Sequence, residues 1–98
     1  MTAEELYTSV IADLAVPSIH PLHQAILEEC CENALANDQG ITGAIELKKV
    51  VHLAFLSALA AAKGILLGAL TAADADQATL QYRGRTFVIP ANSTLLKD

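Results

Sequence analysis

The sequence predicts a mainly helical fold, in which a small three-helix domain with a central apolar helix is followed by a C-terminal β-hairpin. Two segments within the first 37 residues carry apolar side chains at helical spacing. Residues 50–70 are apolar at all but five positions, which is typical of a helix buried all round. Residues 79–89 alternate polar and apolar side chains around Arg83 and Gly84, which predicts a hairpin. A chain of 98 residues fits one domain, residues 1–98.

The first helix is predicted at residues 3–15. Thr2 and Glu5 have the spacing of a capping box, in which each side chain accepts a hydrogen bond from the other residue's backbone N–H. The predicted apolar face consists of Leu6, Tyr7, Val10, Ile11 and Leu14. Two prolines in residues 16–21 end this helix and begin the next one.

The second helix is predicted at residues 21–37, and Gly40 provides a residue that can end it in a left-handed conformation. Its polar side chains are expected to face solvent: Gln24, Glu28, Glu29, Glu32 and Asn33. Its apolar side chains are expected to face the core: Leu22, Ile26, Leu27, Cys30, Ala34 and Leu35.

The third helix is predicted at residues 43–70, with Thr42 as its N-cap. An alternative ends it at Lys63, with Gly64 as the terminator. We favour a continuous or gently kinked helix, because buried packing can offset the roughly 1 kcal/mol that a glycine costs inside a helix. Thr71 then caps a short turn through residues 72–78.

A helix that is apolar all round must be covered by the rest of the chain, by a second copy or by lipid. The other elements barely surround it, so the sequence predicts a homodimer or larger oligomer. Small residues recur at spacings of three and four and predict a seam where two helix backbones approach closely: Ala54, Ser57, Ala61, Gly64 and Gly68. The alternative is ordinary alanine-rich packing in a core.

The hairpin is predicted at residues 79–89, with Pro90 ending its second strand and residues 91–98 forming a loose tail. Pairing Tyr82 with Arg85 also allows these two side chains to stack across the strands. This register places four apolar side chains on one face of the hairpin: Ala78, Leu80, Phe87 and Ile89.

The charges are divided unevenly along the chain, whose net charge is −5. Residues 1–47 hold eight acids and no Lys or Arg, whereas residues 48–98 hold six bases and three acids, which gives −8 and +3. We expect Arg83 and Arg85 to contact an acidic surface of another copy or of a partner protein; the alternative is that they are solvated turn residues. An acidic chain without basic clusters does not favour nucleic-acid binding.

The residues with chemical potential do not form a recognised motif. Cys30 and Cys31 are adjacent, and neighbouring cysteines seldom bridge, so we expect reduced thiols in a cytoplasmic protein. The metal-ligand types in the chain lack a zinc-site spacing: His20, His23, Cys30, Cys31 and His52. We therefore predict no catalytic residue, no metal site and no cofactor.

The prediction for function is a non-enzymatic protein–protein interaction or assembly protein that acts as a small helical homo-oligomer. A phage or mobile-element accessory protein is compatible with the size and the missing chemistry. The alternatives are a small-ligand or metal-binding helical protein and a small membrane-associated protein. A membrane span is not favoured, because the apolar stretch at residues 50–62 is shorter than about 20 residues and Lys63 follows it.

Overall fold

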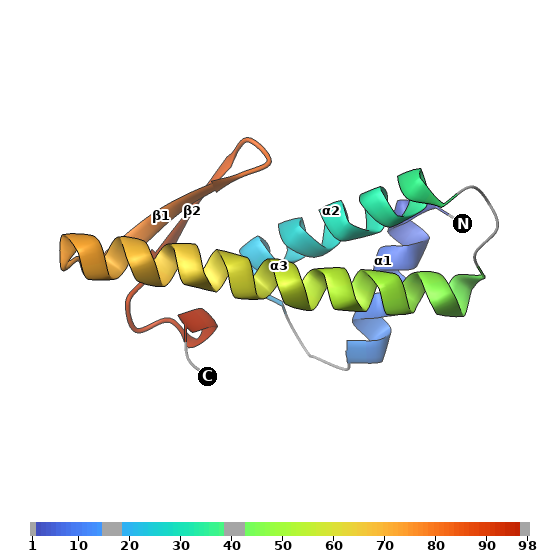
Figure 1. Cartoon of the computed structure of the whole chain (residues 1–98), viewed down its shortest axis with the longest axis horizontal. Coiled ribbons are helices and arrows are strands. Elements are labelled where there is room, and N and C mark those ends of the chain that lie inside the picture. Colours follow the sequence, from blue (N-terminus) through green and yellow to red (C-terminus); the bar gives the residue numbers. More distant parts are fainter. Residues whose placement is uncertain (1, 15–18, 39–42, 97–98) are drawn as a thin grey trace. The chain divides into compact units, whose positions relative to one another are not determined.

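The computed structural model describes residues 2–14, 19–38 and 43–96 (Figure 1). Its elements are α1 (Ala3–Leu14), α2 (Pro21–Asn37), α3 (Ala44–Ala73), β1 (Gln77–Tyr82), β2 (Arg85–Pro90) and the short 3-10 helix η1 (Thr94–Leu96). The predicted fold class, three helices followed by a β-hairpin, is confirmed. The chain divides into two compact units, Met1–Ala58 and Leu59–Asp98, and α3 contributes residues to both. The single domain expected from the chain length stays a prediction.

The predicted capping box forms at the start of α1. The backbone N–H of Thr2 donates to Glu5 Oε1 over 3.2 Å, and the backbone N–H of Glu5 donates to Thr2 Oγ1 over 3.1 Å. Two free N–H groups of the first turn are thereby satisfied. Of the five residues of the predicted inward face, Leu6 and Val10 are buried, whereas Tyr7, Ile11 and Leu14 are half-buried.

The bounds of α2 agree with the sequence prediction, but its N-cap is a histidine. His20 Nδ1 accepts a hydrogen bond from the backbone N–H of Leu22 over 3.0 Å, and Pro21 occupies the first turn, where its missing N–H is harmless. At the other end the N–H of Asp38 donates to Ala34 O over 3.0 Å. Gly40 and the Thr42 cap predicted for the third helix lie outside the described residues.

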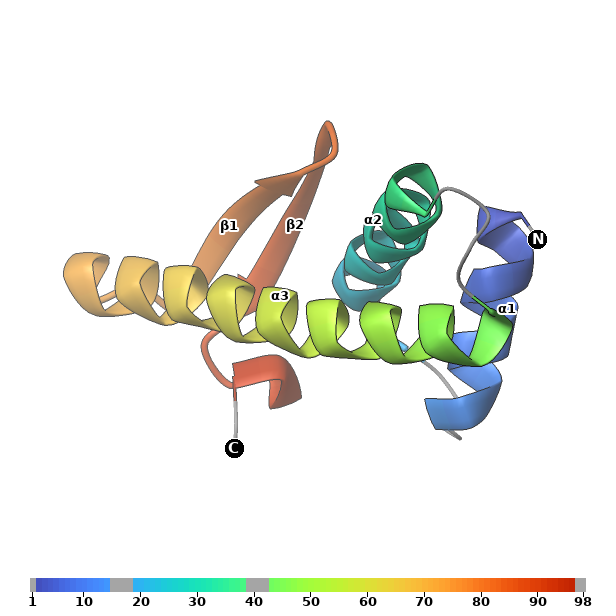
Figure 2. The ribbon, with the colours of Figure 1, turned by 45° about the vertical axis from the view of Figure 1, so that its right-hand side comes forward.

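The core of the first unit is formed by α1, α2 and the N-terminal half of α3, which lie together in Figure 2. The imidazole of His23 meets the ring of Phe55 edge-on, with ring centroids 6.3 Å apart. Lys48 Nζ lies 2.8 Å from Asp13 Oδ2, which joins α3 to α1. The fully buried large side chains of this unit come from all three helices: Leu6, Leu22, Ile26, Leu27, Cys31 and Val51.

α3 is one continuous helix, so the alternative that ends it at Lys63 is wrong. Both glycines lie inside it, and it ends beyond the predicted Leu70. Asp74 takes a left-handed conformation (φ 46°), and the N–H of Ala75 donates to Leu70 O over 3.2 Å. This bond and this conformation form a Schellman ending. The predicted turn after a Thr71 cap is also wrong, because Thr71 lies within α3 and its hydroxyl donates to Leu67 O over 2.8 Å.

Within one chain, α3 is covered on one side only, and cover of the rest by a second copy stays a prediction. Its buried residues in the first unit are Leu47, Val51 and Phe55, and those in the second are Leu66 and Leu70. The spacing of four within each set places them on one side of the helix. Large side chains on the rest of its surface are open, with Leu53 68% and Ile65 60% exposed. In each unit the neighbouring elements are too few to surround α3.

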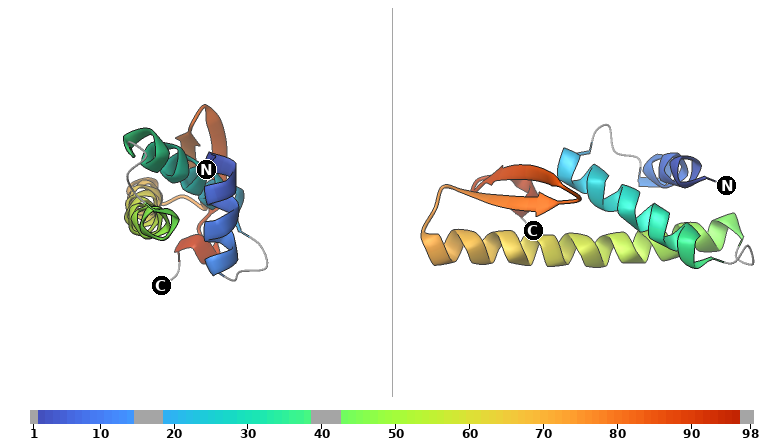
Figure 3. Two further views of the ribbon diagram at one scale, coloured as in Figure 1. Left: turned by 90° about the vertical axis from the view of Figure 1, so that its right-hand side faces the viewer. Right: turned by 90° about the horizontal axis from the view of Figure 1, so that it is seen from above.

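The hairpin of the second unit lies alongside the C-terminal half of α3 (Figure 3, right). Its predicted register is confirmed, with Tyr82 opposite Arg85, Leu80 opposite Phe87 and Ala78 opposite Ile89. Arg83 (φ 54°) and Gly84 (φ 76°) both take positive φ. A two-residue hairpin turn with two positive φ angles matches the right-handed twist of the strands on either side.

Two details of the second unit correct the sequence prediction. The Arg85 guanidinium lies over the ring of Phe87, 4.9 Å from its centroid, whereas the sequence predicts stacking on Tyr82. Arg85 and Phe87 are two residues apart on one strand and therefore share a face. Residues 94–96 form η1 and are not a loose tail, because the Ser93 carbonyl accepts the N–H of Leu96 and its hydroxyl accepts that of Leu95.

Candidate functional site

The candidate site is the uncovered surface of α3, opposite its buried residues. We call it the open face and define it by the exposed positions Val50, Leu53, Ala54, Ser57, Ala61, Gly64, Ile65 and Gly68. All five residues of the predicted small-residue seam belong to it. The helical repeat brings them onto one side of the helix, since their spacings of three and four stay close to 3.6.

The small size of the seam residues is not explained by packing within this chain. A Cβ added at Gly64 or Gly68 meets nothing within 4 Å. Ala54 and Ala61 are exposed as well. Core packing, the alternative given for these residues from the sequence, therefore does not account for them. Small exposed residues let another backbone approach this face closely.

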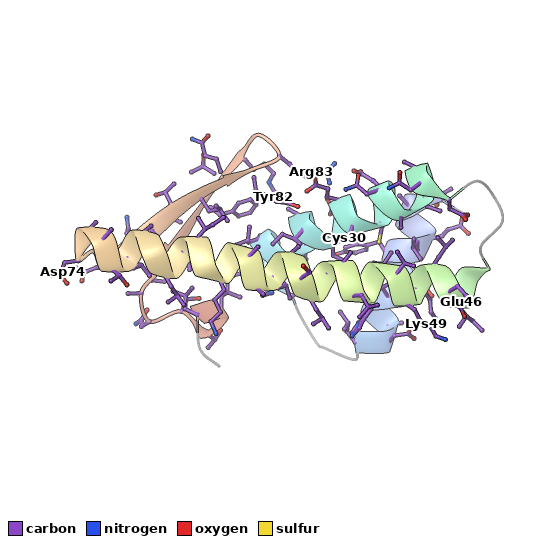
Figure 4. The ribbon with its side chains drawn as sticks, in the orientation of Figure 1. Cys30, Glu46, Lys49, Asp74, Tyr82 and Arg83 are labelled. Carbon is purple, nitrogen blue, oxygen red and sulfur yellow. The ribbon has the colours of Figure 1, made fainter. Side chains whose placement is uncertain are left out.

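The open face is apolar and bordered by charge near its N-terminal end. Lys49 and His52 are exposed there, and Lys49 Nζ lies 3.4 Å from Glu46 Oε1 (Figure 4). Val50 is 51% exposed and begins the apolar part. Isolated exposed apolar residues are ordinary on a protein surface, whereas large contiguous apolar patches are more typical of interaction sites.

A cleft opens in the first unit between α1 and α3. Its volume is about 580 Å³, its walls include Val10, Leu14, Ile45 and Leu53, and the Lys48–Asp13 ion pair lies at its edge. The size suits a small apolar ligand. Lys48 and Asp13 are paired with each other, and Lys49 and His52 also line the cleft.

The histidines and cysteines do not converge on one point. His20 and His23 are neighbours, with ring centroids 6.3 Å apart, and burial together with His20 lowers the pKa of His23. Cys30 and Cys31 are buried free thiols, and burial raises the pKa of Cys31 to about 11. Within residues 2–14, 19–38 and 43–96, no group of three or more His, Cys, Asp or Glu side chains is placed to hold a metal ion.

Cys31 lies deeper than the sequence suggests. The pattern places it at the edge of the apolar face of the second helix, yet its side chain is fully buried, as is that of Ala25. A protonated thiol enclosed by apolar groups is a poor nucleophile. The two cysteines therefore belong to the packing of the first unit.

The arginines predicted to contact a partner are on the hairpin turn. Arg83 lies at the turn (Figure 4), and Arg83 and Arg85 are both exposed. The second unit thus presents two positive charges at one end of the hairpin. Their contact with an acidic surface stays a prediction.

No protein-family model, curated protein or solved structure matches this chain. By length and composition, the stretch Ile45–Ala73 of α3 is sufficient to cross a membrane. Because the comparisons suggest no function, the exposed apolar surface of α3 is the main feature from which a function can be proposed.

Proposed function

We propose that this chain is a non-enzymatic assembly protein, which works by binding a second copy of itself, and through it other proteins, at the open face of α3. The observation that carries the proposal is the exposure of the whole seam together with Leu53 and Ile65. Burying large apolar side chains contributes roughly 1.5–3 kcal/mol each, so leaving them in water weighs against an isolated monomer.

A protein partner suits the open face better than lipid does. Lys63 lies within α3, and a lysine near the centre of a bilayer costs about 2.5–3.5 kcal/mol on insertion scales. In the first unit α2 packs with α3 and exposes the carboxylates of Glu28 and Glu32. In the second unit the hairpin exposes Arg83. Polar elements attached along a helix oppose its immersion in hydrocarbon.

The small-ligand alternative has less support. The cleft beside Lys48 is formed by the first unit alone, and it leaves the exposed side chains of residues 57–68 unexplained. A second copy packed on the open face would cover these exposed side chains. Assembly therefore accounts for more of the exposed surface of α3 than ligand storage does.

The test is the replacement of Ala61 by leucine, at the middle of the seam. A larger side chain would hold the two backbones apart, at an overpacking cost of about 1–3 kcal/mol, so association should weaken by about tenfold or more. Sedimentation velocity over a range of micromolar concentrations measures the change. Ala36→Leu, at an exposed position of α2, is the matched control and should associate like the unmodified protein.

Two outcomes contradict the proposal. One is an unmodified chain that sediments as a 10.3 kDa monomer at all concentrations. The other is a protein that floats with phospholipid vesicles and is monomeric without them, which would favour the membrane-associated alternative.

A further inference from the structure

Two histidines lie at the start of α2, on either side of a core residue. His20 is the N-cap, and its Nδ1 accepts a hydrogen bond from the backbone N–H of Leu22 over 3.0 Å. His23 is the third residue of the helix, and the centroids of the two imidazole rings lie 6.3 Å apart. Leu22 is buried in the first unit, with 1% of its surface exposed. The first turn of α2 is thus held by an imidazole and by a core side chain.

The cap at His20 exists only while its Nδ1 carries no proton. A neutral imidazole has one nitrogen that accepts a hydrogen bond and one that donates, whereas both nitrogens of an imidazolium donate. Protonation of His20 would therefore leave two donors facing each other, its own Nδ1–H and the N–H of Leu22. The oxygen of a Ser, Thr, Asp or Asn cap stays an acceptor throughout the pH range in which histidine titrates.

The start of α2 has no charge of its own that would offset a cation. The N-terminal end of a helix carries a partial positive charge, which disfavours cations and favours Asp or Glu in the first turn. The first turn of α2 contains no acidic residue, and residues 15–19 before it contain no ionisable side chain. Two imidazolium groups at this end would also repel each other. Burial, and after it the charge of His20, lowers the pKa of His23 below its usual value of 6.5.

The helices packed against α2 in the first unit present an apolar ring to His23. This ring is the side chain of Phe55 in α3, whose centroid lies 6.3 Å from that of His23. The ionisable groups of α1 and α3 in this unit have other neighbours: Asp13 pairs with Lys48, Glu46 with Lys49 and Glu5 with Thr2, while His52 lines the cleft and Glu4 and Tyr7 lie beside Glu28. A proton taken up at the start of α2 therefore meets an apolar ring and a helix dipole of the same sign.

We propose that His20 and His23 together form an acid-sensitive switch at the start of α2, which is closed while both imidazoles are neutral and opens when they take up protons. Opening withdraws Leu22 from the core and uncovers Phe55, so it exposes apolar surface in the first unit. The unfolded chain binds a proton at His23 with a pKa of 6.5, and the folded chain does so only at lower pH. Stability is therefore complete above about pH 7 and falls as the pH drops from 6.5 through the folded value. The switch does not depend on the proposed self-association.

Urea unfolding at about pH 7.5 and about pH 5.5 tests the switch, because carboxylates stay largely ionised over this range. We expect the unfolding equilibrium constant of the unmodified protein to rise by about tenfold or more between the two pH values. His20→Ser keeps an acceptor at the cap, and His23→Gln keeps a polar side chain that takes up no proton. In the double variant the rise should be less than about threefold.

His52→Gln is the matched control, because His52 is an exposed histidine of α3 that is not part of the switch. It should keep the pH dependence of the unmodified protein. The proposal is wrong if the double variant loses as much stability on acidification as the unmodified protein does, or if His52→Gln flattens the dependence equally. Should the double variant not fold, His20→Ser alone decides, since serine is a preferred cap and a pH dependence unchanged in this variant would overturn the proposal.

Discussion

Single residues set the ends of the elements, and the sequence predicted them unevenly. The reciprocal bonds of Thr2 and Glu5 were predictable, because two short polar side chains three residues apart have few other local partners. His20 was not predicted as a cap, since its ring nitrogen takes the place usually held by a Ser, Thr, Asp or Asn oxygen. The available signal was Pro21, which favours the first turn of a helix.

A pH dependence follows from the burial of Cys31. Burial, and after it the charges of Cys30, Glu32 and Glu28, raise the pKa of Cys31 from 9.0 to about 11. Below pH 9 the thiol is protonated in both the folded and unfolded states. Between pH 9 and 11 the unfolded chain releases this proton first, so the free energy of unfolding should fall by at most about 1 kcal/mol per pH unit.

Urea titrations at intervals from about pH 7 to 11 measure this fall. Cys31→Ala should be less stable at neutral pH, because it trims a buried side chain, but it should lose less stability as the pH rises. The pKa values of Cys30 and Tyr7 are also raised by burial, so a smaller fall remains in the variant. Parallel pH curves for the two proteins would contradict the assignment to Cys31.

At the scale of elements, the hairpin was more predictable than α3. The register of β1 and β2 follows from the alternation of side chains and the two turn residues, which together allow one pairing. The continuity of α3 was uncertain because a glycine can either end a helix or lie within it. Its incomplete cover was expected, because two helices and a hairpin barely surround a helix that is apolar all round, but the apolar pattern does not say what covers the rest.

Two glycines with different backbone conformations should respond in opposite ways to alanine. Gly84 has φ 76°, where a Cβ is strained, so Gly84→Ala should destabilise the protein by about 1–2 kcal/mol. Gly64 is helical with open space beside it, so Gly64→Ala should stabilise α3 by about 1 kcal/mol.

Thermal and urea unfolding at the lowest practical protein concentration measures both changes, because Gly64 belongs to the proposed contact. Gly43 lies just before α3, also with open space around an added Cβ, and Gly43→Ala serves as a reference outside the hairpin turn and the helix interior. Changes of the same sign for Gly64→Ala and Gly84→Ala would contradict this account.

At the scale of the whole molecule, the division of charge indicates how copies or partners approach one another. Eight acids precede Lys48, and the hairpin turn carries Arg83 and Arg85. Exposed ion pairs contribute roughly 0–1 kcal/mol each, which is small beside apolar burial. Such charges act mainly on orientation and on the rate of encounter.

The candidate site was predictable in part. The spacing of the small residues identifies the residues of the open face, but the sequence of one chain does not identify the partner that binds there.

Reversal of both turn charges tests their role in the approach of copies or partners. Arg83→Glu combined with Arg85→Glu should slow association and flatten its dependence on salt, while the melting temperature changes little. Stopped-flow mixing at low and high ionic strength measures the rates. Arg83→Glu alone is the companion variant, because it leaves the contact between Arg85 and Phe87 intact. Wild-type rates for the double variant at every salt concentration would show that the turn is only solvated surface.

The two adjacent thiols of α2 allow the opening of the first unit to be followed by the rate at which they react. Cys31 is fully buried and Cys30 is 9% exposed, so an alkylating reagent reaches Cys31 when α2 separates from its neighbours. Under conditions where reclosing is fast, the labelling rate of Cys31 gives the free energy of that opening directly. A ligand or second copy that binds only the form in which Cys31 is buried would lower the labelling rate in proportion to its occupancy. The chain therefore carries a native probe of its own assembly, with no added label.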